Sequence, residues 1–101
     1  MKTNDLIGPA LDWAVSVAEL DTEDGLPPQP YSTDWAQGGL IIEREGIALQ
    51  RWLDYGWLAD TWNFKFATGH SQGPTPLIAA MRYYVASKLG FEIDIPEELN
   101  P

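Results

Sequence analysis

The run of residues 75–90 constrains the fold most, because it carries the start, the buried face and the end of one helix. Thr75 is a favourable N-cap, and Pro76 suits the first helical position, where its missing N–H has no intrahelical partner to lose. Gly90 is a typical C-terminal stop. The pattern therefore predicts a helix over about residues 76–89. The expected buried stripe is Ile78, Met81, Val85 and Leu89, and the expected solvent side holds Arg82 and Lys88.

A second helix is predicted over about residues 5–20, where apolar side chains recur at helical spacing. Asn4 can cap this helix. Because proline removes one backbone donor, the first turn is expected to be loose and the regular helix to begin near Gly8-Pro9. The side chains expected on its common face are Leu6, Ala10, Trp13, Ala14 and Val17.

A third helix is predicted over about residues 34–45, with Asp34 as its N-cap and Gly46 in the left-handed C-cap position. The pair Gly38-Gly39 counts against it, since each glycine costs about 1 kcal/mol relative to alanine inside a helix. A shorter helix after the glycines, or a strand through residues 40–42, is the alternative. We favour the helix.

The middle of the chain, over about residues 47–66, predicts a β-hairpin around a turn at residues 54–56. Aromatic and polar side chains alternate in its second arm, which gives one aromatic face. A short edge strand over residues 91–95 would add a third strand. We therefore expect a single α+β domain over residues 1–101, with helices packed on a small antiparallel sheet. The exposed edge of so small a sheet favours a homo-oligomer.

Composition excludes several classes of function. Six basic and fifteen acidic residues give a formal charge of −9, which repels nucleic acid and anionic membranes. The chain has no cysteine, so disulfides, thiolate zinc sites and cysteine nucleophiles are excluded. The sequence shows no signal-peptide pattern and no apolar stretch long enough to span a bilayer. These features are typical of a cytoplasmic protein.

The loop before the last predicted helix has two interpretations. Helix N-termini carry unpaired N–H groups and a positive partial charge, and glycines let an anion approach, so the loop could be an anion-binding cradle. Pro74 and Pro76 count against a cradle, because each removes a donor, and no Walker motif is present. A simple capped helix start is the alternative. The candidate ligand-binding residues of the loop are Gly69, His70, Ser71, Gly73, Thr75 and Arg82, and Gln72 also belongs to the proposed cradle.

The predicted hairpin is a second candidate site. Aromatic faces beside an arginine and an amide are suited to a nucleotide-like ligand, which needs stacking and edge hydrogen bonds. Aromatic side chains that alternate on a strand are also common in a core. Trp57 and Trp62 fall on opposite faces of a regular strand, so one of them should be exposed or in an interface. The candidate residues of the hairpin are Arg51, Trp52, Trp57, Trp62 and Asn63.

Catalytic motifs are weak in this sequence. His70 is the one histidine, and no serine elbow, paired histidines or acidic metal-loop spacing accompanies it. Asp54 and Asp60 bracket the hairpin turn, where facing acids are commonly solvated. We therefore expect no enzyme activity, no cofactor and no metal site.

Several blocks resemble a known family. "LIGPALDWAV", "YSTDWAQGGLIIEREGI" and "GPTPLIAAMRYYVASKLG", with a closing "DIPEEL", are similar to the NinX family of lambdoid-type phages and cover about half of the chain. The "YSTD" start and the tryptophan-rich hairpin also resemble the phage α-β-α sandwich domain. The resemblance implies a phage protein that acts in the host cytoplasm. The family has no known function, so no residue role is carried over.

These observations lead to two hypotheses on function. In the first, a phage accessory protein sequesters a small host molecule without catalysis, as a homo-oligomer, and a nucleotide-derived signal of antiviral defence is the favoured ligand. In the second, the protein is an acidic inhibitor or adaptor of a host or phage enzyme. Its negative field would then speed encounter with a basic surface, and exposed tryptophans would anchor the contact.

Overall fold

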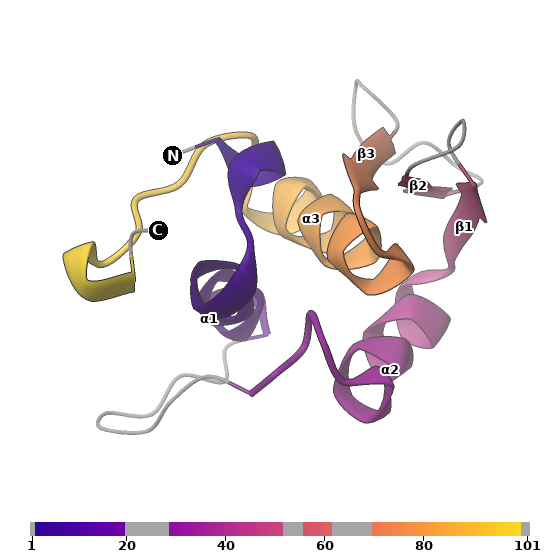
Figure 1. Cartoon of the computed structure of the whole chain (residues 1–101), viewed down its shortest axis with the longest axis horizontal. Coiled ribbons are helices and arrows are strands. Elements are labelled where there is room, and N and C mark those ends of the chain that lie inside the picture. Colours follow the sequence, from indigo (N-terminus) through magenta and orange to yellow (C-terminus); the bar gives the residue numbers. More distant parts are fainter. Residues whose placement is uncertain (1, 20–28, 52–55, 62–69, 100–101) are drawn as a thin grey trace.

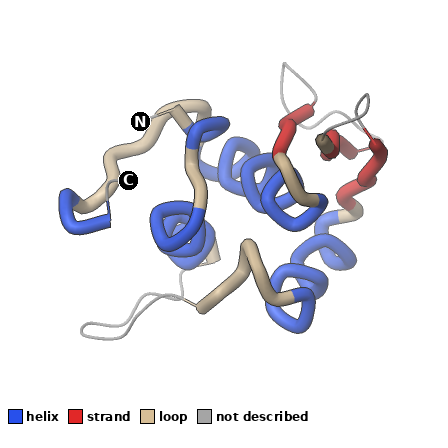
Figure 2. Tube along the Cα trace, viewed as in Figure 1, coloured by secondary structure: helices blue, strands red, loops and turns tan. Residues whose placement is uncertain are grey.

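The computed structural model describes residues 2–19, 29–51, 56–61 and 70–99, and it shows an α+β fold, as predicted (Figures 1 and 2). In chain order the elements are the 3₁₀ helix η1 (Thr3–Asp5), α1 (Gly8–Ala18), α2 (Trp35–Glu45), β1 (Ile47–Arg51), β2 (Trp57–Thr61), β3 (His70–Gly73), α3 (Pro76–Leu89) and the 3₁₀ helix η2 (Glu97–Leu99).

Helix α3 is the centre of the fold and lies between the sheet and α1 (Figure 1). The sequence predicted a single buried stripe, but α3 is buried on nearly all sides, and Leu89 is only partly buried. Alanines explain the difference, because their small side chains let several neighbours approach the helix axis. The buried residues of α3 are Leu77, Ile78, Ala79, Ala80, Met81, Tyr83, Tyr84, Val85 and Ala86.

The sheet is antiparallel in the order β1-β2-β3, and α3 covers one of its faces. The register pairs Arg51 with Trp57 and Asp60 with His70. The described layers are therefore sheet, α3 and α1, with the sheet at one side (Figure 1).

The third strand lies where the sequence predicted a loop. Residues 70–73 pair with β2, whereas the strand predicted over residues 91–95 is reduced to one isolated bridge between Lys2 and Glu92. "HSQG" has no apolar run that marks it as a strand, and its pairing comes from tertiary contact with β2. The two predicted arms of the hairpin do pair, and its residues 52–55 and 62–66 lie outside the described residues.

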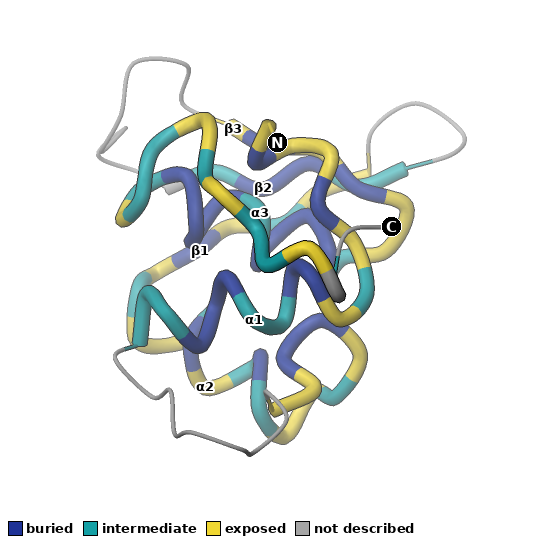
Figure 3. Tube along the Cα trace, turned by 90° about the vertical axis from the view of Figure 1, so that its left-hand side faces the viewer, coloured by how far each residue is buried: buried dark blue, intermediate teal, exposed yellow. Residues whose placement is uncertain are grey.

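Helix α1 begins at Gly8, as the proline predicted, but Asn4 does not cap it. Its N-cap is Ile7, which makes no side-chain hydrogen bond, and Asn4 belongs to η1. Buried and partly buried positions alternate along α1 (Figure 3), and Trp13 and Val17 are only partly buried. The fully buried residues are Ala10, Leu11, Ala14, Val15 and Ser16, so the helix is rotated relative to the predicted face.

Helix α2 runs unbroken through both glycines, which settles the alternatives left by the sequence. Asp34 accepts a hydrogen bond from the Ala36 amide at 2.9 Å, and Gly46 closes the helix with a φ of 67°. Gly38 has a packing role: a Cβ there would lie 2.4 Å from the Tyr31 carbonyl oxygen and 2.6 Å from Leu77 Cδ2. The helix can approach its neighbours only because this side chain is absent.

A polar network ties the ends of the three α-helices together. The Arg44 guanidinium donates two hydrogen bonds to the Glu19 carboxylate, at 2.8 and 3.0 Å, and the Tyr84 hydroxyl donates a third. The hydrogen bond from Arg44 is the largest of the effects that together hold the pKa of Glu19 below its ordinary value of 4.5. Burial and the bond to Glu19 raise the pKa of Tyr84. The Arg44 guanidinium also lies over the Tyr84 ring, 5.7 Å from its centroid.

The two neighbouring glycines of α2 should respond to alanine in opposite ways. Gly38→Ala should lower the free energy of unfolding by about 1–3 kcal/mol, because the new methyl group overlaps backbone. Gly39→Ala should raise it by about 0.5–1 kcal/mol, since its Cβ would meet only the Trp35 ring, at 3.7 Å. Urea unfolding measures both. Changes of the same sign would contradict the packing assigned to Gly38.

The Glu19 network should make stability depend on pH. A carboxyl whose pKa is lowered on folding contributes stability above its ordinary value of 4.5, and this contribution is lost as pH falls through the folded pKa. Glu19→Gln should therefore flatten the loss of unfolding free energy below about pH 4.5. Glu43→Gln, at an exposed position of α2, is the matched control and should leave the slope as in the wild type.

Candidate functional site

A polar pocket of about 280 Å³ lies at the outer edge of β3, where η1 and α3 come together. It brings together four residues that the sequence proposed for the loop and adds one other, Asn4. Asn4 could not be found from sequence spacing, because only the tertiary fold places η1 beside β3. The residues that line the pocket are Asn4, His70, Ser71, Gln72 and Arg82.

Among the described residues that line this pocket, Arg82 is the one arginine or lysine. Its Nε donates to the Leu6 carbonyl at 2.8 Å and its Nη1 donates to the Gln72 carbonyl at 2.9 Å, so one guanidinium links α3 to the N-terminal segment and to β3. The sequence predicts Arg82 toward the solvent side of the helix, and the structure shows the side chain partly buried, because it reaches back over the edge of β3.

The charge of Arg82 is only partly compensated. Burial lowers the pKa of its guanidinium, and Asp5 acts in the opposite direction from nearby. Among the described residues, Arg82 forms no ion pair and its Nη2 has no hydrogen-bond partner. An arginine in this state favours a bound oxygen anion, because carboxylates and phosphates match its planar donors.

The other pocket residues add further polar groups. Asn4 and Gln72 are exposed and carry amides, which can donate and accept hydrogen bonds. His70 is exposed, and Ser71 is 2% exposed. Because successive strand residues point to opposite faces, the imidazole and the hydroxyl leave β3 on opposite sides. His70 and Ser71 therefore do not form a nucleophile and base pair. The polar lining as a whole suits a polar ligand.

Two predicted loop residues serve packing and capping. At Gly73 a Cβ would lie 2.6 Å from the Ala79 nitrogen and 3.0 Å from Ile78 Cγ2, so this glycine lets β3 press against α3. The Thr75 hydroxyl accepts from the Ile78 amide at 3.1 Å, which is the predicted cap. Neither residue lines the pocket. Gly69 lies outside the described residues.

The hairpin candidates are not assembled into this pocket. Arg51 and Trp57 pair across β1 and β2, with the guanidinium carbon 5.4 Å from the ring centroid. This cation–π contact engages both side chains with each other. The remaining candidates, Trp52, Trp62 and Asn63, lie outside the described residues.

The described residues form neither a metal-binding cluster nor a membrane span. No group of three or more histidine, cysteine, aspartate or glutamate side chains is placed to hold a metal ion in the part of the chain that the structure describes. No helix in that same part is long and apolar enough to cross a membrane.

Comparison with known proteins places the chain in a family. No curated protein matches it. Residues 2–88 match the family model described as "Bacteriophage P22, NinX". This range contains η1, α1, α2, the sheet and all but the last residue of α3, and all five pocket residues fall within it. The chain therefore belongs to the NinX family of bacteriophage P22.

Proposed function

We propose that this protein binds a small anionic molecule in the Arg82 pocket and sequesters it from the host without changing it. The observation that carries the proposal is the partly buried guanidinium of Arg82, with Nη2 unbonded among the described residues. Two carbonyl oxygens offset part of the cost of burying this charge. A bound carboxylate or phosphate would offset the remainder and complete the donor pattern.

The favoured ligand is a nucleotide-derived signal of antiviral defence. A phosphate oxygen would accept from Arg82, and the amides of Asn4 and Gln72 would read polar edges of the ligand. A volume of about 280 Å³ suits one compact fragment of such a molecule. The formal charge of −9 opposes highly charged ligands, so a monophosphate should bind better than a triphosphate.

Sequestration without catalysis is supported by the arrangement of the pocket. Along β3 the exposed His70 alternates with the buried Ser71, and among the described residues no further base lines the pocket. A tight binder needs only a preorganised pocket. In a homo-oligomer, a second subunit placed along the edge strand β3 would cover the exposed side chains of His70 and Gln72 and enclose the ligand.

Arginine variants test the pocket directly. Arg82→Gln should weaken binding of adenosine monophosphate by about tenfold or more, which corresponds to a lost charged hydrogen bond. Arg51→Gln removes the same charge outside the pocket and should bind as the wild type does. Isothermal titration calorimetry with adenosine monophosphate and inorganic phosphate measures both, and circular dichroism verifies the fold. Equal losses in the two variants, or no binding by the wild type at millimolar ligand, would sink the proposal.

A second candidate function, an acidic adaptor or inhibitor of another protein, is supported by the outer face of α2. Trp35 is 54% exposed and Leu40 is 66% exposed, on a helix of an acidic protein. Large apolar side chains at the surface are typical anchors of protein interfaces. The negative field would speed encounter with a basic partner.

The α2 face is tested by substituting both anchors. Trp35→Ala with Leu40→Ala should abolish retention of any partner recovered from infected cells, whereas Ile7→Ala, at a third exposed apolar position, should not. Retention by the wild type should fall steeply as salt increases, because the attraction is electrostatic. Pull-down with quantitative mass spectrometry measures both effects. Salt-independent retention that survives the double substitution would exclude this face.

A further inference from the structure

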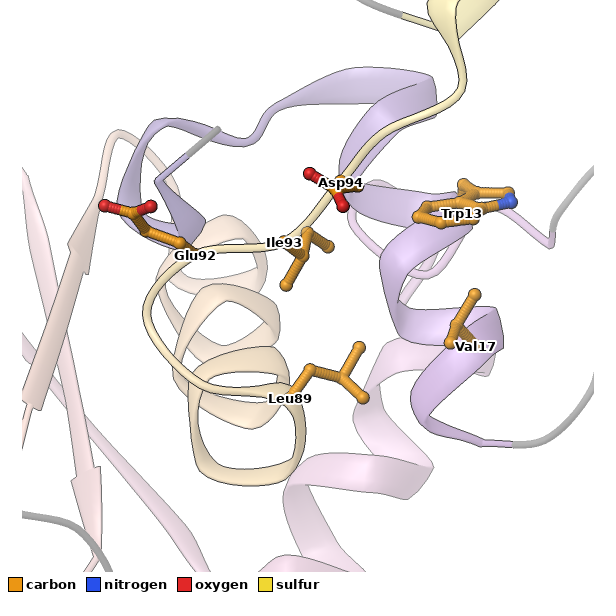
Figure 4. Close-up of a pocket in the computed structure, with 6 residues that line it drawn as sticks. All are labelled: Trp13, Val17, Leu89, Glu92, Ile93 and Asp94. Atoms are coloured by element: carbon orange, nitrogen blue, oxygen red, sulfur yellow. The ribbon is translucent and has the colours of Figure 1, made fainter.

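A second hollow of about 280 Å³ lies between α1, the end of α3 and the segment that follows α3 (Figure 4). It shares no lining residue with the Arg82 pocket. The residues that line it are Trp13, Val17, Leu89, Glu92, Ile93 and Asp94.

The wall formed by the C-terminal segment is held in place by the N-terminal segment. The Thr3 amide donates to the Phe91 carbonyl at 2.7 Å, and the Thr3 hydroxyl donates to the Gly90 carbonyl at 2.6 Å. Lys2 and Glu92 form an antiparallel bridge beside them. Because Thr3 is 1% exposed, these bonds are shielded from water, and the wall is a fixed part of the fold.

The hollow combines an apolar lining with one carboxylate above it. Figure 4 shows Trp13, Val17, Leu89 and Ile93 around the space, and Asp94 between Ile93 and Trp13. Figure 4 also shows the Glu92 carboxylate turned away from the space. Asp94 is exposed and has no hydrogen bond or ion pair among the described residues.

This chemistry fits a cation on an apolar stem. The stem of an arginine or lysine buries its methylene groups on apolar surface and keeps its charged head at the rim. Asp94 would pair with that head, and the Trp13 indole, over which no described residue places a cation, offers a cation–π contact. The hollow has room for one such side chain with part of an apolar neighbour.

We propose that this hollow is the docking site for an arginine-containing segment of a basic partner protein. The formal charge of −9 attracts such a segment and disfavours a second copy of this chain, a nucleic acid or an anionic membrane. The proposal rests on the second candidate function, to which it assigns contact residues and a partner chemistry. It is independent of anion binding at Arg82.

Short peptides test the site without a host partner. The probes are acetyl-Leu-Arg-Leu-amide, its citrulline analogue, which is neutral and of the same shape, and agmatine as a free small cation. Titration into ¹⁵N-labelled protein is followed by NMR, with the Trp13 indole N–H as the local signal. The arginine peptide should shift this signal, and the citrulline analogue should bind about threefold to fivefold more weakly.

Two variants with equal charge loss locate the effect. Asp94→Asn should lower the affinity for the arginine peptide by about threefold to fivefold, to the affinity measured for the citrulline analogue. Glu43→Gln, on α2, should leave the affinity for the arginine peptide unchanged. No shift at Trp13, or equal weakening by both variants, would overturn the site. Agmatine binding as tightly as the peptide would overturn the protein segment as occupant. If the wild-type protein retains no partner through α2 but still binds the peptide, the adaptor function alone is rejected.

Discussion

The fold depends on covering α3 on nearly all sides. A helix that is buried all round needs neighbours on each flank, and the sheet, α1 and α2 supply them in turn (Figure 1). The chain packs these neighbours closely by placing glycines, as well as large side chains, at the contacts. Gly73 lets β3 reach the start of α3, and Gly38 lets α2 reach the Tyr31 carbonyl and Leu77. Both glycines therefore have roles in packing.

Arg82 interrupts the buried stretch 77–86 of α3, and the candidate site follows from it. A guanidinium on α3 must find acceptors where the helix meets its neighbours. It finds the carbonyls of Leu6 and Gln72, which join the N-terminal segment and the sheet edge to α3. The same geometry leaves Nη2 available for a ligand. Arg82 would therefore both join these segments of the fold and bind the proposed ligand.

Local signals in the sequence predicted local structure well. The caps at Thr75 and Asp34 and the stop at Gly46 all act as predicted, because each depends only on its own helix end. The sequence missed what depends on tertiary contact: the strand "HSQG", the approach of Asn4 to His70 and the partial burial of Arg82. The sequence did identify part of the site, but on other grounds. It predicted a cradle at a helix N-terminus, whereas the observed pocket lies at a sheet edge.

We propose that Arg82 holds a small anion that the protein removes from its host. Native mass spectrometry of the protein purified from infected cells, with the cargo released by heat and identified, tests it most directly. We expect one phosphate- or carboxylate-bearing molecule per pocket, present in the wild type and in Arg51→Gln and absent from Arg82→Gln. A protein that emerges empty from infected cells, or the same cargo in all three, would contradict it.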